Sequence, residues 1–279
     1  MNCNWSAFMA VLPSWMRNEV DKYQDDLLEL RLRLGLPAEL ITAKRIIHLN
    51  QIITIRDLEF CVNSASQYSP WSAKTSSNGY ITIDGGHRVG ICGHTAGEGR
   101  ALAFRNITSL CIRVAREFAN ISKDLWNLPG SILVIGRPGC GKTTLLRDII
   151  VQRSNHTCGQ VGVVDERGEI FPFAKGKPCF ETGVRTDILT GCDKLSGVEM
   201  LIRNMTPTTI AMDEITAAED CKALIHAGWC GIDLIATAHA GSCEDLFSRP
   251  VYKPIIDSRL FSHLVTMQPD KTWTVERFN

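Results

Sequence analysis

The segment that most constrains the fold is a glycine-rich turn set between an apolar run and a helical pattern. Residues 136–143 are Gly-Arg-Pro-Gly-Cys-Gly-Lys-Thr and match G-x-x-x-x-G-K-[ST] at every fixed position. The apolar run Ile132–Ile135 precedes the turn, and a helical pattern over Lys142–Gln152 follows it. Glycines in this context let backbone amides approach phosphate oxygens at the positive end of a helix. The context favours a phosphate-binding loop over a fortuitous glycine-rich turn.

The side chains of this loop predict a site for a nucleoside triphosphate with a divalent cation. Lys142 is expected to reach the β- and γ-phosphates, while the Thr143 hydroxyl takes a position on Mg²⁺. The predicted ligands are therefore ATP and Mg²⁺. The predicted nucleotide-binding residues are Gly136, Arg137, Pro138, Gly139, Cys140, Gly141, Lys142, Thr143 and Thr144.

From residue 131 onward, short apolar runs alternate with helical patterns. Such alternation predicts a parallel sheet covered by helices on both faces. The expected strands are Ile132–Ile135, Val161–Val164, Thr209–Met212 and Leu234–Thr237, and the expected helices are Lys142–Gln152, Ser196–Met205 and Ala217–Ala227. The fold class is therefore α/β, with a RecA-like ATPase domain over residues 128–279.

Residues 1–127 differ and are expected to form a smaller α+β domain. Gly79–Ile83 alternates like a strand, residues 84–87 form a turn, and His87–Cys92 is the returning strand of a hairpin. The Ser-rich stretch Ser64–Ser77 is expected to be a loop. The apolar stretch Trp5–Trp15 has helical spacing, which fits a helix packed on its own domain or one that meets a membrane surface or a partner.

Acidic residues follow two of the predicted strands. Asp213-Glu214 ends the run Thr209–Met212, so Asp213 is a candidate for the Mg²⁺ shell and Glu214 for activating a water. Asp165 and Glu166 follow Val161–Val164 and are candidates for a second acidic group near the γ-phosphate. The alternative for Asp213-Glu214 is a solvated acidic pair at a strand end. The alternative for Asp165 and Glu166 is a structural salt bridge with Arg167.

A histidine ends the strand Leu234–Thr237. His239 is a candidate sensor of the γ-phosphate, through a hydrogen bond donated by its ring. The alternative is a histidine whose hydrogen bonds serve the structure alone.

Composition narrows the class of protein. Thirty Lys and Arg balance thirty Asp and Glu, so the formal net charge is zero. That balance argues against a dedicated nucleic-acid binder, which carries a basic excess. The eleven cysteines form no C-x-x-C pair, which favours a reducing compartment and free thiols. No apolar run approaches the roughly 18 residues that span a bilayer.

These motifs together resemble the stage III sporulation protein AA family, in the secretion-ATPase branch of P-loop ATPases. The most specific segments are residues 79–90, Gly-Tyr-Ile-Thr-Ile-Asp-Gly-Gly-His-Arg-Val-Gly, and residues 164–167, Val-Asp-Glu-Arg. Further segments are residues 29–34, 105–116, 190–192, 203–207, 212–215 and 237–240. The resemblance covers nearly the whole chain.

The resemblance implies an ATPase of the mother cell of endospore-forming bacteria. It implies a cytoplasmic protein at the inner face of a membrane complex between mother cell and forespore, with a membrane protein of that complex as partner. It also implies a homo-oligomer, a hexameric ring motor. Traffic ATPases often carry Gly-Glu where this chain has Asp213-Glu214, so the Mg²⁺ site here resembles an ordinary Walker B strand.

The resemblance also implies that arginines from outside the P-loop domain complete the site. Arg105 and Arg113 lie in the region that corresponds to interdomain arginines of traffic ATPases, and a neighbouring subunit is the expected source. Surface charge on a strand is the alternative. Two other functions stay open: a nucleic-acid-dependent ATPase, and a slow nucleotide-switch scaffold, against which Glu214 counts because a switch needs no water-activating acid.

Overall fold

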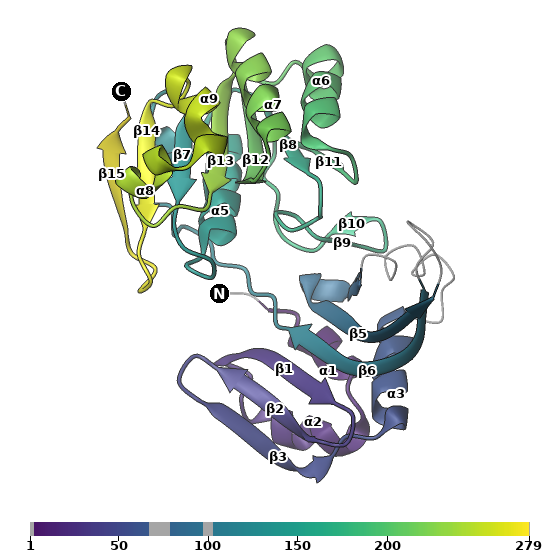
Figure 1. Cartoon of the computed structure of the whole chain (residues 1–279). Coiled ribbons are helices and arrows are strands. Elements are labelled where there is room, and N and C mark those ends of the chain that lie inside the picture. Colours follow the sequence, from purple (N-terminus) through teal and green to yellow (C-terminus); the bar gives the residue numbers. More distant parts are fainter. Residues whose placement is uncertain (1–2, 67–78, 97–102, 279) are drawn as a thin grey trace. The chain divides into compact units, whose positions relative to one another are not determined.

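The computed structural model describes residues 3–66, 79–96 and 103–278, which form two compact units (Figure 1). Unit 1 comprises Met1–Glu117 and Pro172–Phe180, and unit 2 comprises Phe118–Phe171 and Glu181–Asn279. The units part between Glu117 and Phe118, before the predicted boundary at 127–128. The reason is that residues 118–128 are tied to unit 2: Asp148 accepts hydrogen bonds from the amides of Asn120 (2.8 Å) and Ser122 (2.6 Å).

Unit 1 is built on a six-stranded antiparallel sheet in the order β3-β2-β1-β6-β5-β4. Its strands are β1 (Leu27–Arg33), β2 (Pro37–Thr42), β3 (Ile46–Ile52), β4 (Tyr80–Thr82), β5 (Arg88–Ala96) and β6 (Ala103–Arg113). Its helices are α1 (Trp5–Ala10), α2 (Ser14–Asp21), α3 (Ile55–Ser66) and the 3₁₀ turn η1 (Asp84–Gly86). The short strands β9 (Phe173–Ala174) and β10 (Lys177–Pro178) pair with each other in its second segment.

The apolar N-terminal stretch packs inside unit 1. Trp5, Phe8, Leu12 and Met16 are buried in one cluster with the sheet residues, which bears out the reading of a helical segment packed on its own domain. The predicted hairpin is also present, as β4, η1 and β5. The expected loop Ser64–Ser77 is wrong at its start because α3 continues to Ser66, and residues 67–78 lie outside the described residues.

Unit 2 is built on a seven-stranded sheet in the order β11-β8-β12-β13-β7-β14-β15. Its strands are β7 (Ile132–Ile135), β8 (Val161–Asp165), β11 (Thr186–Thr190), β12 (Thr209–Ile215), β13 (Asp233–Ala238), β14 (His263–Met267) and β15 (Trp273–Arg277). Its helices are η3 (Leu125–Asn127), α5 (Lys142–His156), α6 (Lys194–Met205), α7 (Ala218–Trp229), α8 (Cys243–Ser248), η4 (Pro250–Tyr252) and α9 (Lys253–Asp257). All the predicted strands and helices of this half are present.

The sheet of unit 2 is parallel except at one edge, where β15 pairs antiparallel with β14. Leu133, Ile210, Met212 and Leu234 pack in one buried cluster with α6 and α7. Side chains alternate along a strand, so the intervening residues face the other side of the sheet. The sheet is therefore buried on both faces, which explains why its central strands are apolar without alternation.

The carboxyl ends of β7, β8, β12 and β13 meet at one edge because these strands are parallel neighbours. The motifs that follow them, far apart in sequence, are thereby gathered at one place. Ligands of open α/β sheets bind at this edge.

Candidate functional site

The phosphate-binding loop joins β7 to α5. Gly139 and Gly141 have φ of +79° and +102°, a region that residues with a side chain rarely adopt. Gly136 is required for a different reason: a Cβ there would lie 2.5 Å from the Cys140 sulfur and 2.9 Å from Met267 Cβ. The loop therefore has the left-handed turns that direct successive amides into a concave anion site.

Lys142 opens helix α5 and is 94% buried, with 6% of its surface exposed. Its Nζ donates to the carbonyl oxygens of Gly136 (3.0 Å) and Arg137 (3.3 Å), and lies 3.1 Å from His239 Nδ1. The ammonium group is held across the mouth of the loop, where phosphate oxygens can replace the carbonyl partners.

His239 connects this lysine to the acid at the end of β12. Its Nε2 lies 3.1 Å from Glu214 Oε1. An ammonium group can only donate, so Nδ1 accepts from Lys142 and the ring proton lies on Nε2, from which it is donated to Glu214. The structure thus brings together three predicted site residues, Lys142, His239 and Glu214, in one chain of contacts.

Asp213 contacts Thr143, which follows Lys142 at the end of the predicted phosphate-binding loop. The Thr143 hydroxyl donates to Asp213 Oδ2 at 2.6 Å, and the Thr237 hydroxyl donates to Oδ1. A hydroxyl and a carboxylate oxygen at this separation suit Mg²⁺, which takes few protein ligands and completes its shell with phosphate oxygens and water. The two residues predicted for the metal are adjacent and fit it.

Glu214 has a strained backbone that sets the direction of its side chain. Its φ is +48°, and the β12–β13 register shifts between Met212 and Ile215. The Glu214 amide donates to Thr237 Oγ1 (2.9 Å) and its carbonyl accepts from Lys194 Nζ (2.9 Å). These bonds hold a conformation that costs on the order of 1–3 kcal/mol in isolation.

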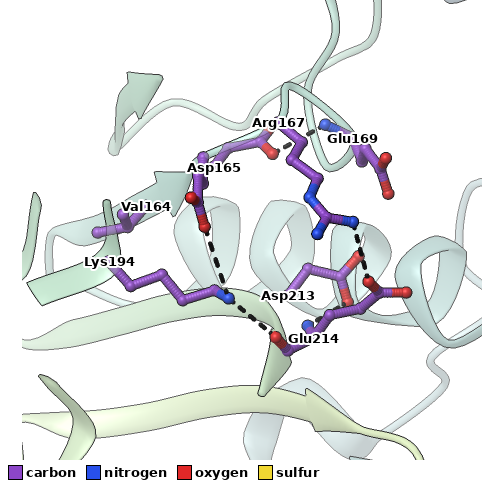
Figure 2. A pocket seen from close by; sticks show the side chains of 8 residues that line it. Val164, Asp165, Arg167, Glu169, Lys194, Asp213 and Glu214 are labelled. Atoms are coloured by element: carbon purple, nitrogen blue, oxygen red, sulfur yellow. Dashed lines mark hydrogen bonds and ion pairs between the residues drawn. The ribbon is translucent and has the colours of Figure 1, made fainter. Parts of the chain in front are cut away.

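Two cations approach Glu214 from other elements (Figure 2). Arg167 lies 3.6 Å from its carboxylate, and Lys194 reaches its carbonyl from the start of α6. A cavity of about 20 Å³ among these groups has the size for about one water. A water there lies beside the carboxylate predicted to activate it.

Asp165 and Glu166 also line the cavity beside Glu214, and their role near the γ-phosphate stays a prediction. Asp165 is buried, and its two oxygens accept from the amides of Glu169 and Phe171, both at 2.8 Å. Burial raises the pKa of Asp165, while these amides act in the opposite direction. Its carboxylate is thus occupied in holding the loop after β8. Glu166 is 44% exposed and lies 3.8 Å from Lys194.

The two arginines predicted from the family pattern both belong to β6 of unit 1. Arg113 lies 3.6 Å from Glu29, with 64% of its side chain exposed. The side chain of Arg105 lies outside the described residues. Their part in a shared site stays a prediction.

Sequence reasoning missed Lys194 and the Thr237 hydroxyl. Lys194 is 8% exposed, and Asp220 Oδ2 is 3.1 Å from its Nζ. One signal pointed to it, because a cation in the first turn of a helix opposes the helix dipole and needs a compensating partner. For Thr237 the strand-end motif pointed to His239, and only the pairing of β12 with β13 places the hydroxyl against Asp213.

Comparison with known proteins shows which family the chain belongs to. The model of the family described as sporulation stage III, protein AA, matches residues 8–275. The chain belongs to this family. Stage III sporulation protein AA of Bacillus subtilis (strain 168) is 35% identical over 276 residues, covering 94% of this chain and 90% of that protein. Protein SEEDLING PLASTID DEVELOPMENT 1 of Arabidopsis thaliana is 27% identical, over 90% of this chain but 36% of its own length.

Solved structures establish the fold of this family member. The Legionella pneumophila ATPase DotB has a TM-score of 0.62 at 16% identity, covering 95% of this chain and 80% of its own. The pilus retraction motor PilT with bound ADP has a TM-score of 0.63 at 11% identity, covering 90% and 77%. The chain thus has the α/β fold of RecA-like secretion ATPases. Among the described residues, no helix has the length and apolarity to cross a membrane.

Proposed function

We propose that this chain hydrolyses ATP to ADP and phosphate as a motor of the secretion-ATPase type, energising a membrane complex between mother cell and forespore. The observation that carries the proposal is the contact chain from Lys142 through His239 to Glu214, next to the Thr143–Asp213 pair. A phosphate-binding cation, a water-activating acid and a metal position within one site are the parts that phosphoryl transfer to water requires.

In this proposal the loop amides and Lys142 hold the phosphates, and Thr143 and Asp213 hold Mg²⁺. When bound, Mg²⁺ neutralises charge on the phosphate oxygens. Glu214 orients the attacking water and accepts its proton. His239 couples Lys142 to Glu214, so a movement of the ammonium group toward phosphate would change the hydrogen bond that His239 Nε2 donates to that acid.

The loss of Lys142 is the direct test. Lys142→Ala is expected to abolish binding of ATP or weaken it greatly, because the phosphates lose their positioned cation. The same variant should still melt cooperatively, since Lys142 Nζ bonds only to two carbonyls and His239 in the described structure. Calorimetric titration with Mg-ATP measures the affinity. Wild-type affinity in this variant would overturn the phosphate-loop assignment.

The motor also needs assembly and a partner. We propose a homo-oligomer, a hexamer, in which Arg105 or Arg113 of a neighbouring subunit completes the site, on the cytoplasmic mother-cell face of a membrane complex. Mixing an Arg113→Ala variant with an inactive Glu214→Gln variant tests this: partial recovery of ATP hydrolysis supports a shared site. Full ATPase activity of both Arg105→Ala and Arg113→Ala, each assayed alone, would overturn it. Mass photometry with and without ATP gives the oligomer.

The effect of nucleic acid on turnover distinguishes the proposed motor from a nucleic-acid-dependent ATPase. Turnover should be unchanged by RNA or DNA and should rise with membrane fractions that hold the sporulation complex. Stimulation by nucleic acid alone would contradict the motor assignment while leaving ATP hydrolysis intact.

A further inference from the structure

Two cavities within unit 2 are lined by different residues of the predicted phosphate-binding loop. One is lined by Gly136, Arg137 and His239, the groups next to the predicted γ-phosphate end. The other is lined by Gly139, Gly141 and Thr144. A phosphate chain held by the loop amides has its outer end on the His239 side. Its inner end, which carries the sugar and base, therefore points to the Thr144 side.

The cavity on the Thr144 side differs in chemistry from its counterpart. Apart from Lys271, its further walls include the apolar or aromatic side chains of Phe118, Ile121, Met267 and Trp273. Trp273 is half-buried and opens β15, and Met267 is buried at the end of β14. The volume is about 280 Å³, at the small end of ligand pockets, as suits a pocket for one part of a ligand. A flat aromatic heterocycle is the part of a nucleotide that such walls bind.

The polar groups that line this cavity predict which purine bases it can bind. Adenine and guanine differ at position 6, where adenine presents an amino donor and guanine a carbonyl acceptor. Among the described lining side chains, the Thr144 hydroxyl alone is a strong acceptor, while Lys271 and the Trp273 indole only donate. Donors suit N7, which both purines share, and O6 of guanine. The Thr144 hydroxyl can accept from the amino group of adenine or donate to O6 of guanine, so the lining side chains do not strongly prefer either purine.

We propose that this cavity receives the purine base of the nucleotide, stacked on Trp273, and that the site takes both ATP and GTP. The proposal rests on the proposed function only in placing a nucleoside triphosphate on the loop. The proposal requires that this nucleotide binds, and it does not depend on whether the nucleotide is hydrolysed.

Titration calorimetry on the full chain tests it with three probes: Mg-ATP, Mg-GTP and inorganic tripolyphosphate, which has no base. The affinities of the wild type for ATP and GTP should agree within about fivefold. Trp273→Ala should weaken both by roughly tenfold, the scale of lost base stacking, and leave tripolyphosphate unchanged. Trp229→Ala is the matched control, because Trp229 is 80% exposed at the end of α7.

A preference for ATP over GTP of about a hundredfold would overturn the argument that the lining side chains do not distinguish the two purines. Equal loss of tripolyphosphate affinity in Trp273→Ala would show a damaged loop and overturn the base pocket, as would unchanged ATP affinity. Should Trp273→Ala not fold, energy transfer from tryptophan to a ribose-labelled ATP replaces it. Transfer must fall in Trp273→Phe and persist in Trp229→Phe. Normal binding without hydrolysis would sink the proposed function and leave this pocket standing.

Discussion

Strands β8 and β12 are hydrogen-bonded neighbours, and each has an Asp-Glu pair near its carboxyl end, yet the two aspartates have different partners. After Asp165 the chain turns back, so the amides of Glu169 and Phe171 surround its carboxylate. After Asp213 the strand bulges and continues, and the carboxylate meets the hydroxyls of Thr143 and Thr237 instead. Identical dipeptides at equivalent strand ends thus meet different partners: the Asp165 carboxylate holds a loop, and the Asp213 carboxylate lies against the Thr143 hydroxyl, where the metal is predicted.

The glutamates of the two pairs differ in the same way. Glu214 accepts from His239 and lies near Arg167, within the contact chain to Lys142. Glu166 is more exposed and lies near Lys194 alone among the ion pairs of the described structure. The comparison teaches that a strand-end acid acquires its role from the chain that follows it and from the strand beside it.

Glu214→Gln should have the largest effect and sharpens the comparison most. Hydrolysis is expected to slow by roughly 10²-fold or more, the scale of a lost general base, while Mg-ATP binding is kept. Single-turnover hydrolysis and ATP titration measure the two quantities. If turnover stays near the wild-type rate, the β8 pair becomes the better candidate for the water-activating acid.

Asp165→Ala tests the loop-anchor role through stability. At least two amides lose their acceptor, so the free energy of unfolding should fall by on the order of 2 kcal/mol or more. Urea unfolding followed by circular dichroism measures the change. Hydrolysis per folded molecule should stay close to the wild type. A large loss of turnover at unchanged stability would instead favour the role near the γ-phosphate.

Thr237→Val examines the partner that distinguishes Asp213 from Asp165. The substitution keeps the shape and removes the hydroxyl that orients the carboxylate, so the Mg²⁺ concentration for half-maximal hydrolysis should rise by roughly tenfold. Thr266→Val on β14 is a control, because its buried hydroxyl has no hydrogen-bond partner in the described structure. An unchanged Mg²⁺ requirement in Thr237→Val would remove Thr237 from the metal site.

Glu166→Gln should have the smallest effect. A half-exposed ion pair is worth about 0–1 kcal/mol, so turnover is expected to stay within roughly threefold of the wild type. The same hydrolysis assay that follows Glu214→Gln measures it. A collapse of activity here would break the contrast between the two pairs and restore Glu166 as a catalytic group.

Local patterns alone predicted the parallel core and the phosphate-binding loop. An apolar run before a glycine-rich turn and a helix is compatible with few folds other than a P-loop domain. Strands buried on both faces can be recognised in the sequence because their polar and apolar residues do not alternate. The edge strands β11 and β15, and β14 beside β15, were not predicted, since short runs outside the centre of the sheet carry mixed polarity.

The sequence by itself identified the candidate residues for phosphate and metal. Asp213, Glu214 and His239 stand at strand ends, and Lys142 and Thr143 follow the loop after β7; a parallel sheet must bring these segments to one edge. Only the tertiary structure decided which partners the acidic side chains of these strands contact. The burial of Asp165 depends on a loop that returns over it, and the setting of Glu214 depends on a bulge held by Thr237 and Lys194. Such contacts join residues distant along the chain, so no local pattern encodes them.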